Sequence, residues 1–178
     1  MKVWFTIPYS IEKNLGKAYN QEMERIPDGD AACFLDGDTL FLTHDFGEII
    51  TSYANAYPDA VLTCWTNRIH EKAIEQKKDF KSTDIKDHLK IKQGFTTVTP
   101  LQGSVSGFLL VVPKSVWLKH KFTETNIYRP GTPNLLGVDN EFTNKIRSAG
   151  IPVLRMDGVY IWHSYRLLSD GMDKSHLL

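Results

Sequence analysis

Short apolar runs alternate with amphipathic stretches along this chain, and the alternation predicts strands separated by helices. The run at residues 31–35 is continuously apolar, which is typical of a strand that helices cover on both faces, and residues 61–66 form the next predicted strand. A further strand is expected at residues 3–7, before Pro8. Between the strands, apolar side chains recur at helical spacing, first at Leu15, Ala18, Tyr19, Met23 and Ile26 and then at Phe46, Ile49, Ile50, Tyr53 and Tyr57.

The second half of the chain is less regular. Further strands are expected at residues 96–99, 105–112, 153–154 and 159–162, with a short helix after Pro113 and a longer one from Asp139 to Gly150. Three segments are expected to lie outside the regular strands and longer helices. They are polar helical turns over the sheet at residues 67–94, a long loop with Pro and Gly at 120–137, and a loose tail at 169–178. The pattern as a whole predicts one α/β domain over residues 1–178, with a mostly parallel central sheet flanked by helices.

Composition and charge narrow the class of protein. The 178 residues are 42% hydrophobic, which is enough apolar content for one buried core. The 21 basic and 21 acidic side chains cancel, so we expect neither nucleic acid nor an anionic membrane surface as a partner. No apolar run approaches the roughly 18 residues of a membrane-spanning helix, and Cys33 and Cys64 lie inside apolar runs as small buried hydrophobic residues do. These features predict a cytoplasmic protein without a transmembrane segment.

Candidate chemistry begins where the second predicted strand ends on two acids. Asp36 and Asp38 follow that strand with one glycine between them, and His163 directly follows the last predicted strand. Because open α/β sheets bind ligands beyond the carboxyl ends of their strands, we expect these three side chains to share one rim. Two carboxylates and an imidazole suit Mn²⁺ or Mg²⁺, whose remaining positions would go to water and phosphate oxygens. The order of residues therefore predicts a cation that bridges a diphosphate.

Two further acids stand at the start of a predicted helix. Asp139 could take a proton from an attacking hydroxyl group, and the helix dipole would help to keep its carboxylate ionised. Glu141 is close enough in sequence to support Asp139 or to contact an acceptor. Each motif alone has a structural alternative, because the acid pair could form a turn, Asp139 a helix cap and His163 a packing residue. Only their joint order favours a functional site.

In this order the motifs resemble those of family 2 glycosyltransferases, which have the Rossmann-like GT-A fold. The chain resembles a compact member of that family. The resemblance spans nearly the whole chain. It rests on Pro8-Tyr9 after the first strand, Ala18-Tyr19-Asn20, Phe34-Leu35-Asp36-Gly37-Asp38, Ser106-Gly107-Phe108, Asp139-Asn140-Glu141 with Lys145 and Gly150, and Trp162-His163. The resemblance implies a DxD motif at Asp36 and Asp38, a metal-binding histidine at His163 and a catalytic base at Asp139.

The resemblance also implies a reaction and its partners. A nucleotide diphosphate sugar, with a uridine diphosphate sugar favoured, would give its sugar to a hydroxyl of a glycan or of another acceptor, with inversion at the transferred carbon. Asp36 would contact the ribose and the metal, and Asp38 the metal. The other implied site residues are Pro8, Tyr9 and Asn20 for the nucleotide, Ser106 and Gly107 for the sugar and acceptor, and Glu141 beside the base.

The chain departs from the family pattern at two points. The segment before the DxD motif is short and lacks a strand and the base-reading Asp that this family normally has there, which leaves Asn20, Asn67 or Arg68 as candidates for that task. One acid of the expected pair before the last helix is missing, since the chain has Val138-Asp139 there. Two other functions stay open: a nucleotide-sugar or glycan binding module without turnover, and a phosphatase of the haloacid dehalogenase type, whose nucleophile loop the DxD segment resembles superficially.

Overall fold

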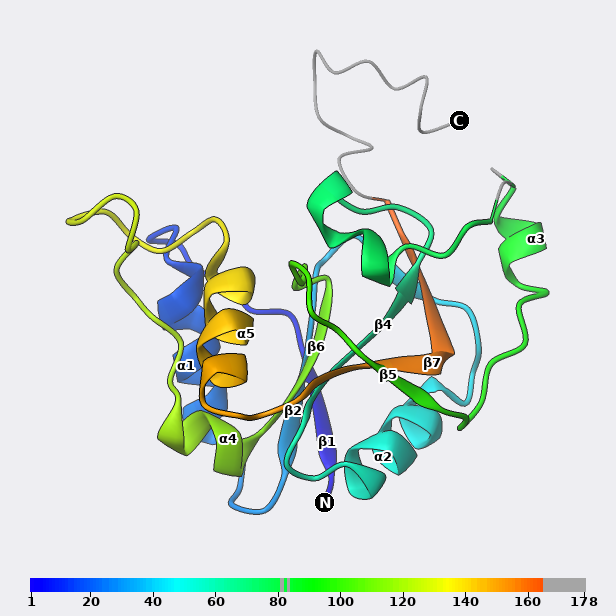
Figure 1. Cartoon of the computed structure of the whole chain (residues 1–178), viewed down its shortest axis with the longest axis horizontal. Coiled ribbons are helices and arrows are strands. Elements are labelled where there is room, and N and C mark those ends of the chain that lie inside the picture. Colours follow the sequence, from blue (N-terminus) through cyan, green and yellow to red (C-terminus); the bar gives the residue numbers. More distant parts are fainter. Residues whose placement is uncertain (81, 83, 165–178) are drawn as a thin grey trace, which may run out of the picture.

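The computed structural model describes residues 1–80, 82 and 84–164. The strands are β1 (Val3–Thr6), β2 (Ala31–Leu35), β3 (Thr39–Phe41), β4 (Val61–Thr66), β5 (Val98–Pro100), β6 (Leu109–Pro113) and β7 (Val153–His163). The helices are α1 (Leu15–Arg25), α2 (Phe46–Ala56), the 3₁₀ helix η1 (Glu71–Gln76), α3 (Ile85–His88), α4 (Lys114–Lys119) and α5 (Val138–Ser148). Figure 1 shows the sheet in the middle, with α1, α4 and α5 on one side and α2 on the other.

The strands form one mixed sheet. Within the described residues its order is β1-β2-β6-β4-β7-β3, and β5 also pairs with β7. In this part of the chain β1 with β2 and β4 with β7 are parallel, whereas the other four pairings are antiparallel. The expectation of a mostly parallel sheet is therefore wrong. A continuous apolar run indicates that helices pack on both faces of a strand. Helices can pack in this way on parallel and on antiparallel strands, so the run does not determine strand direction.

The two sides of β2 show this double cover directly. Ala32 and Phe34 pack into a core cluster that includes residues of α1, α4 and α5, whereas Ala31 and Cys33 pack into a second cluster with residues of α2. Cys64 of β4 lies in the second cluster as well, and both cysteines are fully buried free thiols. The prediction that the two cysteines are buried is confirmed.

The strand directions bring distant parts of the chain to one edge of the sheet. Because β6 is antiparallel to both of its neighbours, β2 and β4, the strands β1, β2, β4 and β7 all run the same way. Their carboxyl ends therefore meet at one edge, and the first residues of β6 lie there too, since Leu109 pairs with Leu35. This edge is where Asp36 and His163 come together.

Two strands differ from their predicted bounds. β7 is a single strand that bulges between Met156 and Tyr160, where the sequence suggested a gap between two strands. β6 begins at Leu109 and not at residue 105, because the backbone just before it is bonded to side chains and not to a neighbouring strand. The bulge and the late start both place irregular backbone close to the carboxyl edge.

The segments outside the sheet follow the predictions more closely. The polar segment 67–94 contains the helical turns of η1 and α3, and segment 120–137 leads as a loop into α5. α5 begins at Val138 after Gly137, whose φ is +81°, so Asp139 lies in the first turn and is not the cap residue. The predicted tail at 169–178 lies outside the described residues. Among the residues that the structure describes, every helix is too short or too polar to cross a bilayer.

Candidate functional site

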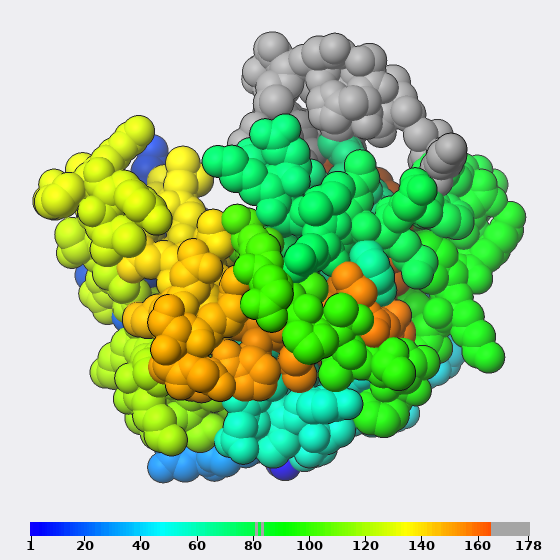
Figure 2. Space-filling view, viewed as in Figure 1, coloured from blue at the N-terminus to red at the C-terminus, as the bar shows by residue number. Residues whose placement is uncertain are grey.

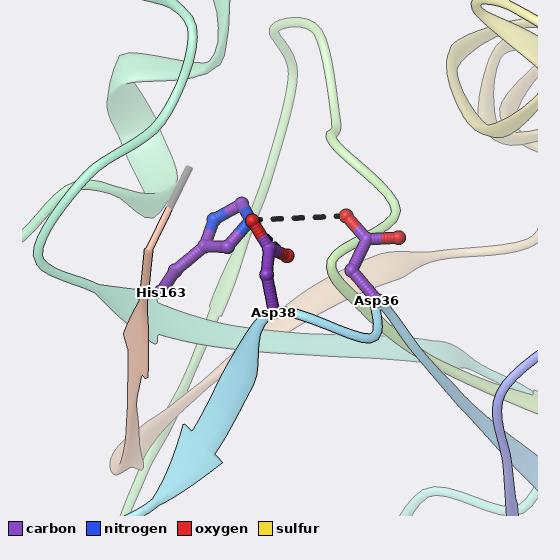
Figure 3. A group of neighbouring side chains, drawn as sticks. All are labelled: Asp36, Asp38 and His163. Carbon is purple, nitrogen blue, oxygen red and sulfur yellow. Dashed lines mark ion pairs between the residues drawn. The ribbon is translucent and has the colours of Figure 1, made fainter. Parts of the chain in front are cut away.

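Two acids and a histidine meet at the carboxyl ends of β2 and β7, and Figure 3 shows the three side chains pointing toward one another. Asp36 and Asp38 flank the turn that leaves β2, in which the Thr39 N–H and hydroxyl both donate to the Asp36 carbonyl. Thr39 pairs with His163 across β3 and β7, which fixes the turn beside the histidine. His163 Nε2 lies 3.2 Å from Asp38 Oδ1 and 3.8 Å from Asp36 Oδ2. The structure thus brings together the three side chains predicted to share a rim.

Protein groups orient the His163 ring. Its Nδ1 lies 3.1 Å from the carbonyl oxygen of Arg68, which can only accept, so Nδ1 carries a proton and Nε2 offers a lone pair toward the acids. The His163 N–H donates to Asn67 Oδ1 at 2.7 Å, and the ring stacks on Phe108 with centroids 5.3 Å apart. In this structure Asn67 and Arg68, which the sequence suggested as base-reading residues, contact the histidine: Asn67 holds its backbone, and the Arg68 carbonyl favours the ring tautomer that binds metal ions.

The donor set fits a hard divalent cation. One ligand atom from each of the three residues lies within 4.8 Å of the others. Two ligands of one cation are at most about 4 to 5 Å apart, because each metal–ligand bond is about 2.0 to 2.5 Å long. The Asp36 and Asp38 side chains are 46% and 44% exposed, so water and ligand oxygens have access to the remaining positions. These residues therefore fit a hard divalent cation.

The electrostatics of the cluster also favour a cation. Burial, together with the nearby carboxylates of Asp38 and Asp139, raises the pKa of Asp36 to about 6. Burial lowers the pKa of His163 and outweighs the opposite effect of Asp38, which favours a neutral ring. Within the described part of the chain neither acid forms an ion pair with a lysine or an arginine. The cluster therefore carries negative charge that a divalent ion would neutralise.

A further carboxylate, Asp139, lies near this cluster in the first turn of α5. Its Oδ2 accepts the Gly107 N–H at 2.5 Å, and its Oδ1 accepts the Asn140 N–H at 2.9 Å. Burial raises the pKa of Asp139, although these backbone N–H groups act in the opposite direction. A carboxylate that is fixed in orientation and has a raised pKa is suited to accept a proton.

Gly107 makes the close contact with Asp139 possible. A methyl group placed on Gly107 would lie only 2.9 Å from Asp139 Cβ and 3.2 Å from Asp139 Oδ2. The next residue, Phe108, accepts the Asp36 N–H on its carbonyl oxygen at 3.1 Å. Gly107 and Phe108 therefore connect Asp139 with the acids that end β2, and the predicted residues Gly107, Asp139 and Asp36 lie in one site.

Two neighbouring side chains of η1 hold the segment that carries Gly107. Glu75 Oε2 accepts the N–H groups of Gln102 and Gly103 at 3.1 and 3.2 Å. Gln76 is fully buried; its Oε1 accepts the Ser106 N–H at 2.8 Å and its Nε2 donates to the Ser106 carbonyl at 3.1 Å. No sequence pattern predicts this support, because Glu75 and Gln76 belong to a polar segment without a motif. The predicted residue Ser106 thus contributes through its backbone.

Asn20 has a structural role in this structure. Its Nδ2 donates to the Phe122 carbonyl and to Glu124 Oε1, both at 2.9 Å. Its Oδ1 accepts the Trp117 Nε1–H at 2.8 Å and the Phe122 N–H at 3.0 Å. The side chain is buried and fixes the start of loop 120–137. Asn20 was predicted to contact the nucleotide, but in this structure its side-chain oxygen and nitrogen form hydrogen bonds with other residues of the protein.

The remaining predicted residues lie on the rim. Pro8 and Tyr9 follow β1 at the carboxyl edge, and Tyr9 is 80% exposed. Glu141 Oε2 accepts from Asn134 Nδ2 at 3.1 Å, which ties α5 to loop 120–137. Figure 2 shows a hollow in the surface between this loop, in yellow, and the blue-green segment that includes η1.

The acid cluster, Asp139 and Gly107 form one candidate site at the carboxyl edge of the sheet. Comparisons with protein-family models, with curated proteins and with solved structures found no match to this chain. The chemistry of these residues is therefore the basis on which a function can be proposed.

Proposed function

We propose that this chain is a glycosyltransferase that uses a divalent cation to move a sugar from a nucleotide diphosphate sugar to an acceptor hydroxyl. One observation carries the proposal: two kinds of carboxylate lie at the same edge of the sheet. Asp36 and Asp38 form, with His163, a partly exposed cluster that fits Mn²⁺ or Mg²⁺. Asp139 is a separate carboxylate that the Gly107 N–H orients. Transfer from such a donor needs a positive charge for the leaving diphosphate and a base for the acceptor.

The acid cluster would hold the diphosphate part of the donor. A bound cation supplies the positive charge that stabilises the departing diphosphate. Asp36 and Asp38 present their carboxylates at the surface, where a large anionic ligand has access, and the Arg68 carbonyl keeps His163 Nε2 aimed at them. The exposed Tyr9, which follows β1 at the same edge, is placed to border the nucleotide. We favour a uridine diphosphate sugar because of the resemblance described above.

Asp139 would accept the proton of the attacking hydroxyl. Its raised pKa makes it a stronger base than an exposed aspartate, while its two backbone hydrogen bonds hold the carboxylate in one orientation. Direct attack by the deprotonated acceptor on the sugar carbon inverts the configuration there. The acceptor would lie along Ser106 and Gly107. Loop 120–137, tied to α5 through Glu141, would form the outer wall of its site.

A melting-temperature titration tests the proposal. Uridine and guanosine diphosphates are added with and without Mn²⁺ to the wild-type chain and to Asp38→Ala. At about 100 times its dissociation constant, the matching nucleotide stabilises the wild type by about 2.7 kcal/mol, or about 5 to 10 °C for a chain of this size. We expect this stabilisation to require both Mn²⁺ and Asp38, since the variant lacks one of few protein ligands.

Asp45→Ala serves as the matched control, because Asp45 also lies beside a histidine, with His44 Nε2 2.7 Å from its Oδ1, but belongs to an exposed pair outside the cluster. In this variant, the nucleotide with Mn²⁺ should raise the melting temperature as much as in the wild type. If neither nucleotide stabilises the wild type with or without Mn²⁺, the proposal is wrong. Stabilisation without any sugar transfer, measured with uridine diphosphate sugars and glycan acceptors, would instead indicate a binding module.

A further inference from the structure

A buried tyrosine in α1 has a hydroxyl group that forms no hydrogen bond with the described part of the chain. Tyr19 is only 2% exposed, and its ring stacks on Phe122 and meets Phe34 edge-on, with centroids 4.6 Å away in both cases. Among the described residues none forms a hydrogen bond with its hydroxyl. Fully buried tyrosine hydroxyl groups ordinarily have such a partner. The hydroxyls of Tyr53 and Tyr160 do have one: Tyr53 accepts the Thr96 N–H at 2.8 Å, and Tyr160 lies 2.6 Å from His88 Nδ1. Within the described residues, the fully buried side-chain polar atoms without a partner are Asn140 Oδ1 and Arg147 Nε, so the Tyr19 hydroxyl at the tip of the packed ring keeps contact with solvent.

The Tyr19 hydroxyl lies at the proposed active site. A methyl group placed on Gly107 would be 3.2 Å from Tyr19 Oη and 3.2 Å from Asp139 Oδ2, so these two oxygens are at most twice that distance apart. Burial raises the pKa of Tyr19, and the carboxylates of Asp139 and Asp36 raise it further. The hydroxyl therefore keeps its proton at neutral pH and acts as a donor next to groups that can only accept.

We propose that Tyr19 is a substrate-contacting residue whose hydroxyl donates a hydrogen bond to a sugar oxygen held between Asp36 and Asp139. The packed ring fixes the position of the hydroxyl, and because no described residue accepts its proton, the hydroxyl can donate that proton to the ligand. The inference rests on the proposed function, because the sugar is the ligand that this function brings to the site. The oxygen belongs either to the donor sugar or to the acceptor, and binding and transfer measurements distinguish these two sources.

Tyr19→Phe tests the inference, because it removes the hydroxyl and keeps the ring. The melting temperature should stay within about 2 °C of the wild type, since no protein hydrogen bond is lost. The affinity for uridine diphosphate with Mn²⁺ should also be unchanged. If the hydroxyl contacts the donor, the affinity for the best of UDP-glucose, UDP-galactose and UDP-N-acetylglucosamine falls about tenfold. If it contacts the acceptor, donor affinity is unchanged and the transfer efficiency falls about tenfold.

Tyr53→Phe is the matched control, because it removes a hydroxyl that accepts N–H groups from Thr96 and Gly158 in the core. This variant should melt several degrees lower than the wild type and keep the wild-type affinity and transfer efficiency. Wild-type donor affinity and transfer efficiency in Tyr19→Phe would overturn the inference and leave the proposed function standing. A loss of melting temperature in Tyr19→Phe as large as in the control would also overturn it, since the hydroxyl would then have a protein partner. A wild-type chain that neither binds nor transfers any of these sugars would overturn both.

Discussion

Strand β7 carries two clusters of charged residues. In the first, which we call the closed cluster, the charged side chains are paired with one another. Near the middle of the strand, Asp157 Oδ1 pairs with Arg155, at 3.0 Å from Nε and 2.9 Å from Nη2. Asp157 Oδ2 accepts the hydroxyl groups of Thr97 and Thr99 at 3.1 and 2.8 Å. The Arg155 guanidinium also stacks 3.4 Å from the centre of the Trp65 ring. Each charge in this cluster is therefore matched within the protein.

The second cluster, at the end of the same strand, is built in the opposite way. His163 faces Asp36 and Asp38, and the part of the chain that the structure describes places no lysine or arginine in an ion pair with either acid. Burial and two neighbouring acids raise the pKa of Asp36 to about 6. A fold stabilised by its charges would be arranged like the first cluster. In the second, the acids have no lysine or arginine partner among the described residues, which is the arrangement that the proposed cation site requires.

The largest expected effect concerns Asp139, an acid that also lacks a basic partner in the described residues. Asp139→Asn keeps an oxygen to accept the Gly107 N–H, but it loses the acceptor of the Asn140 N–H and cannot take up the acceptor's proton. Transfer should fall about 10³-fold, while donor affinity stays near the wild type and the melting temperature falls by no more than a few degrees. Initial rates at saturating donor, combined with a nucleotide titration, measure both effects.

Asp157→Asn serves as its control, because it changes an acid of the closed cluster in the same way. The folded fraction of this variant should transfer at the wild-type rate. Wild-type transfer by Asp139→Asn would show that Asp139 is not the base.

Stability separates the two clusters most directly. Asp157→Ala leaves Arg155, whose side chain is only 10% exposed, without its carboxylate, and should lower the free energy of unfolding by about 3 kcal/mol. Asp38→Ala, measured in EDTA, should change it by no more than about 0.5 kcal/mol, because its carboxylate is 44% exposed and has no basic partner among the described residues other than His163. Urea unfolding of both variants gives the comparison. Equal losses would contradict the distinction between a closed and an open cluster.

Gln76 connects the two regions, and its replacement should have an intermediate effect. The preceding residue, Glu75, accepts a hydrogen bond from Arg155 on its backbone carbonyl, and Gln76 holds both backbone groups of Ser106 beside Gly107. Gln76→Leu is similar in volume but leaves these groups without partners. It should lower the free energy of unfolding by about 2 kcal/mol and the transfer rate of the folded protein about tenfold, because the donor to Asp139 loses its support.

Gln93→Leu is the matched control for this prediction. Gln93 Oε1 accepts the Tyr160 N–H at 3.0 Å, so the variant loses a comparable side-chain to backbone bond outside the segment that carries Gly107. It should be destabilised without a change in the transfer rate of the folded protein. Equal effects of the two variants on that rate would show that Gln76 acts only through general stability.

The sequence predicts the position of those site residues whose place in the fold follows from a local sequence pattern. Asp36 and Asp38 end a strand, and His163 ends another, so a rule about strand ends is enough to place all three at one edge. The direction of β6 has no such local signal, which is why the sheet was expected to be mostly parallel. Gln76 lies 30 positions from Ser106, and Asn20 lies 102 from Phe122. Their roles depend on contacts that form only when the chain has folded.

The smallest expected effect concerns the thiols of Cys33 and Cys64, which lie in the core between the sheet and α2. Burial raises the pKa of both, and because the thiolate is the reactive form, neither should be labelled by a disulfide reagent at pH 8 while the chain is folded. Labelling then reports opening of the core. Asp38→Ala should leave the slow rate of cysteine labelling unchanged. Asp157→Ala should raise this rate, because the closed cluster stabilises the fold and the open cluster around Asp36 and Asp38 does not. Fast labelling of the wild type would contradict the burial on which this reading of the two clusters depends.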